Sequence, residues 1–225
     1  MEICSGNHRL DTAWVFHICI PQRDLGATRC ASAKTVETKH SAPNNALPEV
    51  TEWIGFNYVL SDKNPEGKGV HFFVDDYQFE RVWNNPDAYI EKLKKYACVM
   101  APDFSPYGDM PLATQIFNHY RKHWVAAYWQ ARGITVIPTI RCSTDDRSLE
   151  WYLDGEPKHS IVAYSSMWVR KDKVGVWDSA VKEFKTMMET LKPSMILVYG
   201  EVFPFMDGAN IERIEKFTEK RWGNK

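Results

Sequence analysis

Several acidic residues and one arginine follow directly on short apolar runs of the sequence, and these residue types suit acid–base chemistry and anion binding. They are Asp75, Asp76, Asp103, Arg141 and Glu201. A carboxylate at such a position can act as a general base or bind a hard metal ion, and an arginine can clamp a phosphate through two parallel hydrogen bonds. We therefore predict a site in which Asp103 is the base or a metal ligand and Arg141 binds an anion. Asp75 or Asp76, together with Glu201, would assist Asp103.

The same carboxylates suit a divalent metal, Mg²⁺ or Mn²⁺, with Asp103 and Glu201 as ligands and water or substrate oxygens completing the shell. Asp75 and Asp76 are adjacent, so in an extended segment their side chains diverge and at most one of them joins that site. Other interpretations stay open at this point. Each of these two aspartates is equally well explained as a helix cap or turn residue, and Arg141 as the ion-pair partner of one of the acids.

Smaller polar residues end or follow the same apolar runs, and we predict them as further pocket residues. They are Ser105, Thr139, Ser165 and Tyr199. His71 begins a predicted strand, which is typical of a packed or capping histidine. Cys142 has no histidine in an obvious partner position, which favours a buried small hydrophobic residue over a nucleophile.

Two histidines, His119 and His123, stand at i,i+4 spacing, which can bind a metal. Tyr120 occupies the place of the glutamate in the metalloprotease motif H-E-x-x-H, and Arg121 and Lys122 lie between the histidines. We therefore predict a solvent-exposed helix face here. The sequence contains no G-x-x-x-x-G-K-[ST], G-x-G-x-x-G or G-x-S-x-G, which removes support for the common phosphate-loop, dinucleotide and hydrolase sites.

The elements that must position these residues are clearest between 98 and 141. Residues 98–101 form an apolar run, 111–132 carry a helical pattern that ends before Gly133, and 134–140 form a second apolar run. This is a strand-helix-strand unit, in which polar residues just after the strands tend to line the site.

The same alternation extends along the chain, with further strands predicted near 70, 160 and 195 and a weaker one near 56. A helix is predicted over 177–191, and the stripe of apolar residues from 210 to 222 predicts a terminal helix. Strands that alternate with helices predict an α/β fold with a mainly parallel sheet. The sheet is either open and three-layered or an incomplete (β/α) barrel, and both place the strand carboxyl ends on one edge.

Composition divides the chain into two parts. Residues 1–50 contain a stretch rich in Ala, Thr, Ser, Asn and Pro and are predicted to be a poorly ordered extension, whereas 51–225 are predicted to be a single α/β domain. Five cysteines without C-x-x-C spacing favour reduced thiols, and no apolar run reaches 18 residues, so we expect a cytoplasmic protein without a membrane segment. The net charge of −1 does not indicate nucleic acid as a partner of the whole chain.

Several short sequence motifs, taken together, resemble the DUF4417 family, a domain family of bacteria, phages and other mobile elements. The motifs are VHFFVDDYQFERVW at 70–83, APDFS at 101–105, DMP at 109–111, VIPT at 136–139, DG at 154–155 and VYG at 198–200. The resemblance covers about residues 53–201 and implies a single α/β domain, without an assigned reaction or catalytic residues. Cys142 stands where the family pattern leads us to expect a tryptophan, and the region of Met167 and Trp168 lacks an expected glycine.

These observations support more than one function. The first is a phage-type enzyme, assisted by Mg²⁺ or Mn²⁺, that acts on a nucleotide or nucleic acid at the strand ends. The alternative is a non-catalytic module that binds protein or nucleic acid through a basic and aromatic surface. That surface is formed by Lys158, Trp168, Arg170, Lys171, Lys173 and Trp177. A third hypothesis is a base-exchange enzyme with an aspartate nucleophile facing a base-sized cavity. An open, polar strand-end edge favours an enzyme, whereas a closed, apolar edge beside exposed tryptophans favours the binding module.

Overall fold

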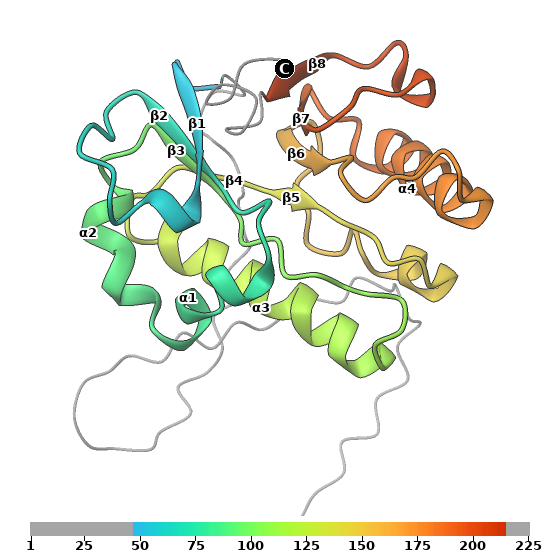
Figure 1. Cartoon of the computed structure of the whole chain (residues 1–225), viewed down its shortest axis with the longest axis horizontal. Coiled ribbons are helices and arrows are strands. Elements are labelled where there is room, and N and C mark those ends of the chain that lie inside the picture. The colour runs from blue at the N-terminus through green and yellow to red at the C-terminus, as the bar shows by residue number, and fades with distance from the viewer. Residues whose placement is uncertain (1–46, 215–225) are drawn as a thin grey trace, which may run out of the picture.

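A computed structural model describes residues 47–214 of the protein. The predicted extension over 1–50 falls almost wholly outside the described residues, and so does most of the predicted helix over 210–222. The described part contains eight strands and four α-helices joined by loops and short 3₁₀ turns (Figure 1). The helices are α1 (Arg81–Asn84), α2 (Ile90–Leu93), α3 (Leu112–Gln130) and α4 (Val174–Leu191).

The strands form two four-stranded sheets in which every pairing is parallel, as the alternation of strands and helices predicts. The first sheet contains β1 (Glu52–Gly55), β2 (Lys68–His71), β3 (Cys98–Met100) and β4 (Val136–Ile137). The second contains β5 (Thr139–Ile140), β6 (Ile161–Ser165), β7 (Met195–Tyr199) and β8 (Ile211–Ile214). Spatial order follows sequence order in both sheets.

One chain segment, residues 136–140, joins the two sheets. On one side, the backbone N–H of Ala101 donates to the carbonyl of Ile137 at 2.8 Å. On the other side, the N–H of Ala163 donates to the carbonyl of Pro138, also at 2.8 Å. Pro138 has no N–H to donate and falls between β4 and β5, where the segment changes partners. The strands therefore follow one another in a continuous series from β1 to β8.

The series curls into an incomplete barrel rather than an open sheet. Tyr199 at the end of β7 stacks on Phe73 after β2 with ring centroids 5.2 Å apart, and its ring lies 4.7 Å from that of His71. Four strand spacings separate β2 from β7, which in a flat sheet is about 19 Å. The rings can meet only because the two sheets face each other. Cys98 and Met100 of β3 accordingly share an interior cluster with residues of β6, β7 and β8.

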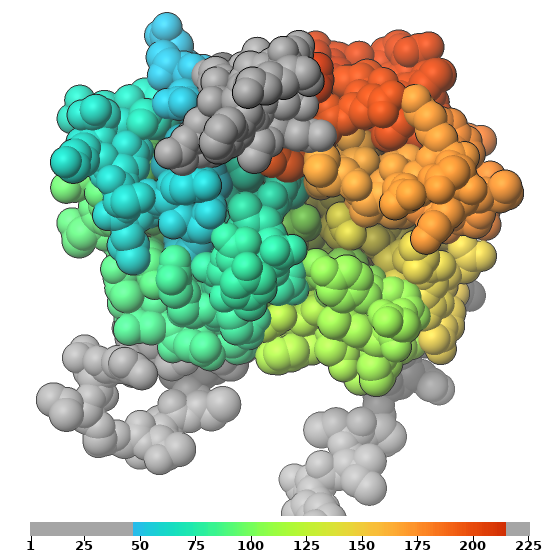
Figure 2. All heavy atoms as spheres, viewed as in Figure 1, coloured from blue at the N-terminus to red at the C-terminus, as the bar shows by residue number. Residues whose placement is uncertain are grey.

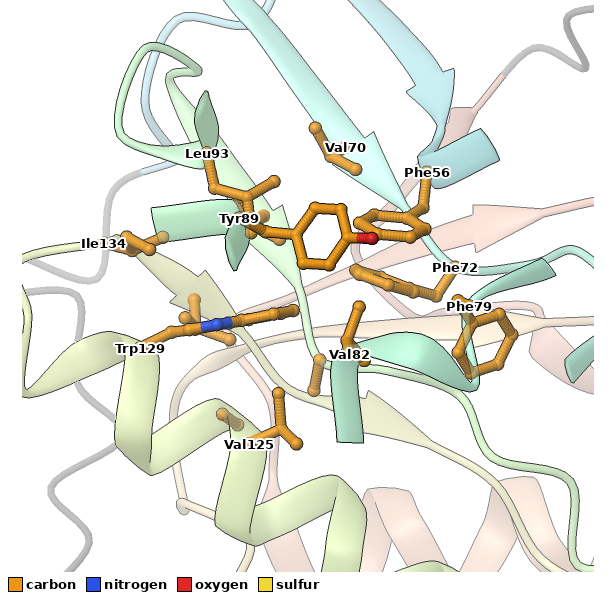
Figure 3. Close-up of a cluster of buried hydrophobic side chains, with 14 of the residues drawn as sticks. Phe56, Val70, Phe72, Phe79, Val82, Tyr89, Leu93, Val125, Trp129 and Ile134 are labelled. Atoms are coloured by element: carbon orange, nitrogen blue, oxygen red, sulfur yellow. The ribbon is translucent and has the colours of Figure 1, made fainter. Parts of the chain in front are cut away.

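Two larger apolar clusters lie outside the strands, under the helices. One packs the outer face of the first sheet against α1, α2 and α3, with Phe56 stacked on Phe72 at 4.7 Å and Trp129 of α3 beneath them (Figure 3). The other packs the second sheet against α4 through residues such as Phe184 and Met187. Burial on both faces explains why these strands read as continuous apolar runs.

Two expectations about helices are wrong. The crossover helix α3 matches its predicted range, but His119, Arg121, Lys122 and His123 are buried rather than exposed to solvent. Several of their polar groups have partners inside the protein: the Lys122 ammonium, for example, donates to the Thr139 carbonyl at 2.9 Å and to the Glu156 carboxylate at 2.6 Å.

The second wrong expectation concerns the end of the described chain. Residues 211–214 form β8, where the apolar stripe predicts a helix. They pair in parallel with β7, and tertiary pairing of this kind overrides a local helical pattern. None of the helices within residues 47–214 is both long and apolar enough to cross a membrane.

Candidate active site at the strand ends

A cavity of about 470 Å³ opens at the carboxyl ends of the strands. Its lining comes from the ends of β1, β2, β6 and β7 and from the segments that follow β1, β2, β3, β5 and β6. Figure 2 shows a hollow near the middle of the visible face, between the teal segment after β2, the green segment before α3 and the orange segment after β6. The edge formed by the carboxyl ends of the parallel strands, where a site is expected, thus contains an open cavity.

Six of the side chains predicted for the site line this cavity. They are Asp75, Asp103, Ser105, Arg141, Ser165 and Tyr199. Asp75 is exposed at the rim, and its carboxylate is within 3.4 Å of the Gln78 side-chain amide. Asp103 is buried, with 8% of the residue exposed. The two aspartates therefore meet the cavity in different environments.

Three predicted residues lie elsewhere. Asp76 accepts hydrogen bonds from the backbone N–H of Ser105 at 3.0 Å and from its hydroxyl at 2.9 Å, so it orders the segment after β3. Thr139 is fully buried, and its hydroxyl lies 3.3 Å from the Ala101 carbonyl. Glu201 lies on the surface, where its carboxylate pairs with the Lys171 ammonium at 2.6 Å.

The predicted metal ligands are consequently not assembled. Glu201 does not belong to the cavity lining, and Asp76 is engaged by Ser105. Among residues 47–214, no group of three or more His, Cys, Asp or Glu side chains is arranged to hold a metal ion. The donor set therefore does not fit the predicted metal centre, and the chemistry of the cavity rests on Asp103, Arg141 and their neighbours.

Asp103 has a buried carboxylate that is incompletely satisfied. Its Oδ1 has no hydrogen-bond partner within the described part of the chain. Burial raises the pKa of Asp103, and the positive charges of Arg141 and Lys122 offset part of that rise. A carboxyl group with a raised pKa, beside a cation and open to a cavity, is suited to taking and giving a proton.

Arg141 supplies the positive charge of the cavity. Its guanidinium carbon lies 5.2 Å from the centre of the Trp168 ring, and the Nε of Arg141 finds no hydrogen-bond acceptor among residues 47–214. The indole N–H of Trp168 is likewise without an acceptor there. Both side chains line the cavity, so a bound anion would supply acceptors that the described chain does not.

His71 is one of the cavity residues that the sequence interpretation missed. Its Nδ1 accepts from the Phe73 backbone N–H at 3.3 Å, so in the neutral ring Nε2 carries the proton. That Nε2 has no acceptor within the described residues, and burial lowers the pKa of His71 to about 4. His71 thus presents a neutral N–H donor. Its place in an apolar strand with acidic residues directly after it was the available signal, but only closure of the barrel makes His71 part of a cavity wall.

A buried acid on α4 holds the segment that follows β5. Glu183 accepts hydrogen bonds from the backbone N–H of Cys142 and, at 3.2 Å, from the Tyr164 hydroxyl. Burial raises the pKa of Glu183 to about 7, with the charge of Arg141 acting in the opposite direction. Cys142 is a buried free thiol, as predicted, and burial raises its pKa to about 12. Glu183 therefore fixes the residue next to Arg141.

Comparison with protein families supports the resemblance noted in the sequence. The family model described as "Domain of unknown function (DUF4417)" matches residues 33–217. The chain belongs to the DUF4417 family. The match begins inside the segment predicted as an extension and reaches past β8, so this DUF4417 domain includes every element described above.

Two curated phage proteins are similar to this DUF4417 chain. The "Gene 1 protein" of Mycobacterium phage L5 is 38% identical over 138 residues, which is 60% of this chain and 58% of that protein. The "Gene 1 protein" of Mycobacterium phage D29 is 35% identical over 153 residues, or 67% of this chain and 55% of that protein. The chain thus spans somewhat more than half the length of these relatives. No solved structure matches it.

Proposed function

We propose that this DUF4417 domain is an enzyme that acts on a nucleotide bound in the strand-end cavity. In this proposal Asp103 transfers the proton and Arg141 binds the phosphate. The observation that carries it is a pair of oppositely charged groups in one cavity, the buried Asp103 and the half-buried Arg141, each with a buried polar atom that lacks a partner in the described chain. Such atoms are rare in folded proteins unless a ligand or water satisfies them.

The charge arrangement supports a proton-transfer role for Asp103. The Arg141 and Lys122 charges favour its ionised form, whereas burial favours the neutral form. Burial and the two cations thus act on the pKa of Asp103 in opposite directions, and a general acid–base group uses both its neutral and its ionised form. Lys122 contributes through space only, because its ammonium is bonded to Thr139 and Glu156.

The walls of the cavity support a planar ligand. His71, Phe73 and Tyr199 place three rings at its surface, and the Trp168 ring lies against Arg141. Aromatic rings stack on nucleobases of any sequence, and an arginine beside them suits the phosphate. A volume of about 470 Å³ falls within the range of small-molecule sites.

The alternative of a non-catalytic binding module has less support. The strand-end edge is an open cavity whose lining includes charged and polar side chains, and this feature supports an enzyme. Two of the surface cations are paired, Arg170 with Asp172 at 3.1 Å and Lys171 with Glu201 at 2.6 Å. Trp168 lines the cavity, and Trp177 packs edge-on against Phe203. Little of the proposed basic and aromatic surface is left for a macromolecule.

Binding is tested by measuring the melting temperature of the full chain with a panel of nucleoside 5′-monophosphates. We expect at least one of them to raise the melting temperature of the wild type and of Arg170→Gln, an exposed control outside the cavity. Arg141→Gln should abolish that rise. Retention of the full rise in Arg141→Gln would remove Arg141 from phosphate binding, and no rise with any nucleotide would sink the proposal.

The catalytic part is tested by following the bound nucleotide chromatographically. We expect Asp103→Asn to bind the nucleotide but to lower its turnover by at least about a hundredfold, the contribution typical of general acid–base groups. Asp172→Asn, a surface aspartate paired with Arg170, is the matched control and should react like wild type. Equal turnover in Asp103→Asn and wild type would exclude Asp103 as the proton-transfer group.

A further inference from the structure

We propose that the cavity contains a base-recognition subsite beside Gly55, where His71 donates a hydrogen bond to the edge of a nucleobase and Asn57 accepts one from it. This inference rests on the proposed function and adds which part of the ligand lies where. The phosphate would occupy the Arg141 side of the cavity and the base the Gly55 side.

Gly55 marks an open space rather than an unusual backbone. Its φ of −69° and ψ of 145° are ordinary extended values that any residue adopts. A Cβ atom added to Gly55 would lie 2.5 Å from Asn57 Oδ1, 3.4 Å from Val74 Cγ1 and 3.6 Å from His71 Cε1. A side chain at position 55 would therefore crowd Asn57 and fill space beside His71, so the glycine keeps both groups accessible.

The two groups beside Gly55 are a donor and an acceptor, and both await a partner. His71 is 2% exposed, and its Nε2–H has no acceptor in the described chain. Asn57 lies on the turn Phe56–Tyr58 directly after β1, and its buried Oδ1 has no donor among those residues. Leaving two buried polar atoms unsatisfied in this way is unfavourable unless a ligand or water forms hydrogen bonds with them.

A nucleobase has the edge that such a pair recognises. Each base presents hydrogen-bond donors beside acceptors on its edge, and its face can stack on aromatic rings. Phe73 and Tyr199, stacked on each other and in contact with the His71 ring, supply aromatic surface at the same subsite. A sugar phosphate without a base offers neither the edge nor the face, so the subsite should not contribute to its binding.

The subsite is tested by calorimetry with two ligands, ribose 5-phosphate and the nucleoside 5′-monophosphate that binds most tightly. The quantity compared is the dissociation constant of ribose 5-phosphate divided by that of the nucleotide. We expect a wild-type ratio of about ten or more; tenfold corresponds to about 1.4 kcal/mol, which lies within the range that stacking of one base contributes. In Gly55→Ala the ratio should fall to about one, with ribose 5-phosphate binding unchanged. Gly175→Ala, at an open position of α4, is the matched control.

A second variant, His71→Phe, keeps a ring of similar size and removes the Nε2–H. It should lower the same ratio at least about threefold without weakening ribose 5-phosphate binding. A full wild-type ratio in both variants would overturn the subsite while leaving phosphate binding at Arg141 intact. Absence of binding by every phosphate compound to the wild type would instead overturn the proposed function and the subsite together.

Discussion

At the scale of single residues, the same side chain acquires different roles from its surroundings. Asp76 and Asp103 both follow a strand. Asp76 accepts two hydrogen bonds from Ser105, whereas Asp103 keeps one oxygen without a partner among residues 47–214 and faces a cavity. The first arrangement stabilises a loop and the second is available for chemistry. Residue type and position along the chain do not separate these two cases.

Asp103 should make the folded protein less stable than a neutral side chain of similar size would at the same position. Because burial raises the pKa of Asp103, its ionised form at neutral pH is less favourable in the folded state than in the unfolded state. We expect Asp103→Asn, which is neutral and nearly the same size, to melt at a higher temperature than wild type at pH 7.5. Asp172→Asn should not gain stability. A lower melting temperature for Asp103→Asn would mean that Arg141 and Lys122 stabilise the charge more than burial opposes it.

Glu183 should make stability depend on pH in a defined direction. Its pKa rises from 4.5 to about 7 on folding, so its contribution is fully present below pH 4.5 and is lost as the pH rises through 7. Relative to Glu183→Gln, the wild type should lose on the order of 3 kcal/mol of unfolding free energy between those pH values. Urea titrations of both proteins from pH 4.5 to 8 measure this difference.

The matched control for Glu183 lies on the same helix. Glu189 is exposed on α4, and its carboxylate is 3.9 Å from the Lys185 ammonium. Glu189→Gln should follow the wild-type pH profile throughout. A stability difference between wild type and Glu183→Gln that stays constant over this pH range would show that Glu183 is ionised in the folded protein well below pH 7.

At the scale of elements, buried polar contacts connect the helices to the strands that carry the site. The Lys122 ammonium of α3 donates to the Thr139 carbonyl of β5 and to Glu156, and Glu183 of α4 accepts from the residue after Arg141. These contacts fix β5 and the residues after it from both sides. The helices therefore contribute directly to the geometry of the cavity edge.

The Lys122–Glu156 pair provides a test of that connection. Lys122→Met removes the cation that lies 2.6 Å from the buried Glu156 carboxylate, so we expect a loss of about 3–5 kcal/mol of unfolding free energy. The double variant Lys122→Met/Glu156→Gln should recover part of this loss, because the buried charge is removed as well. Chemical denaturation measures both.

An exposed lysine provides the control for this pair. Lys182 lies 3.4 Å from Asp146 on the surface, where ion pairs contribute little, so Lys182→Met should leave the denaturation midpoint nearly unchanged. Additive losses from Lys122→Met and Glu156→Gln would contradict a coupling between the two side chains, since contacting residues are expected to be non-additive.

At the scale of the whole molecule, the two sheets share one interior. The cluster that contains Cys98 and Met100 from the first sheet also contains Ala163 and Leu197 from the second, and Tyr199 stacks across the opening. Neither sheet can bury these side chains without the other. The cavity, whose lining draws on both sheets, exists only when the two are joined.

We therefore expect the two sheets to unfold together. Far-UV circular dichroism and tryptophan fluorescence should give the same urea midpoint in a single transition, because the shared interior couples both sheets. Tyr199→Leu should lower the unfolding free energy by about 2 kcal/mol, and with it the urea midpoint, because the ring contacts with Phe73 and His71 are lost. Two separated transitions in the wild type would contradict a shared interior.

The order of residues along the chain is sufficient to predict the class of fold and the sheet edge at which the cavity lies. Apolar runs near 70, 98, 134, 160 and 195 alternate with helical patterns, and this pattern alone leads to parallel strands whose carboxyl ends meet. Asp103, Arg141 and Tyr199 were found in this way, because the residue after a strand is readable from the chain. The resemblance to DUF4417 was likewise carried by contiguous motifs.

Which of these residues share a cavity, and what surrounds them, depends on the three-dimensional packing. Glu201 follows a strand as Asp103 does, yet it pairs with Lys171 on the surface. His71 became a cavity wall because the barrel closes on Tyr199, and the polar face of α3 was buried because Glu156 and the Thr139 carbonyl are there to receive Lys122. The physical reason is that pairing, burial and barrel closure depend on contacts between residues far apart in the chain, which local pattern does not encode.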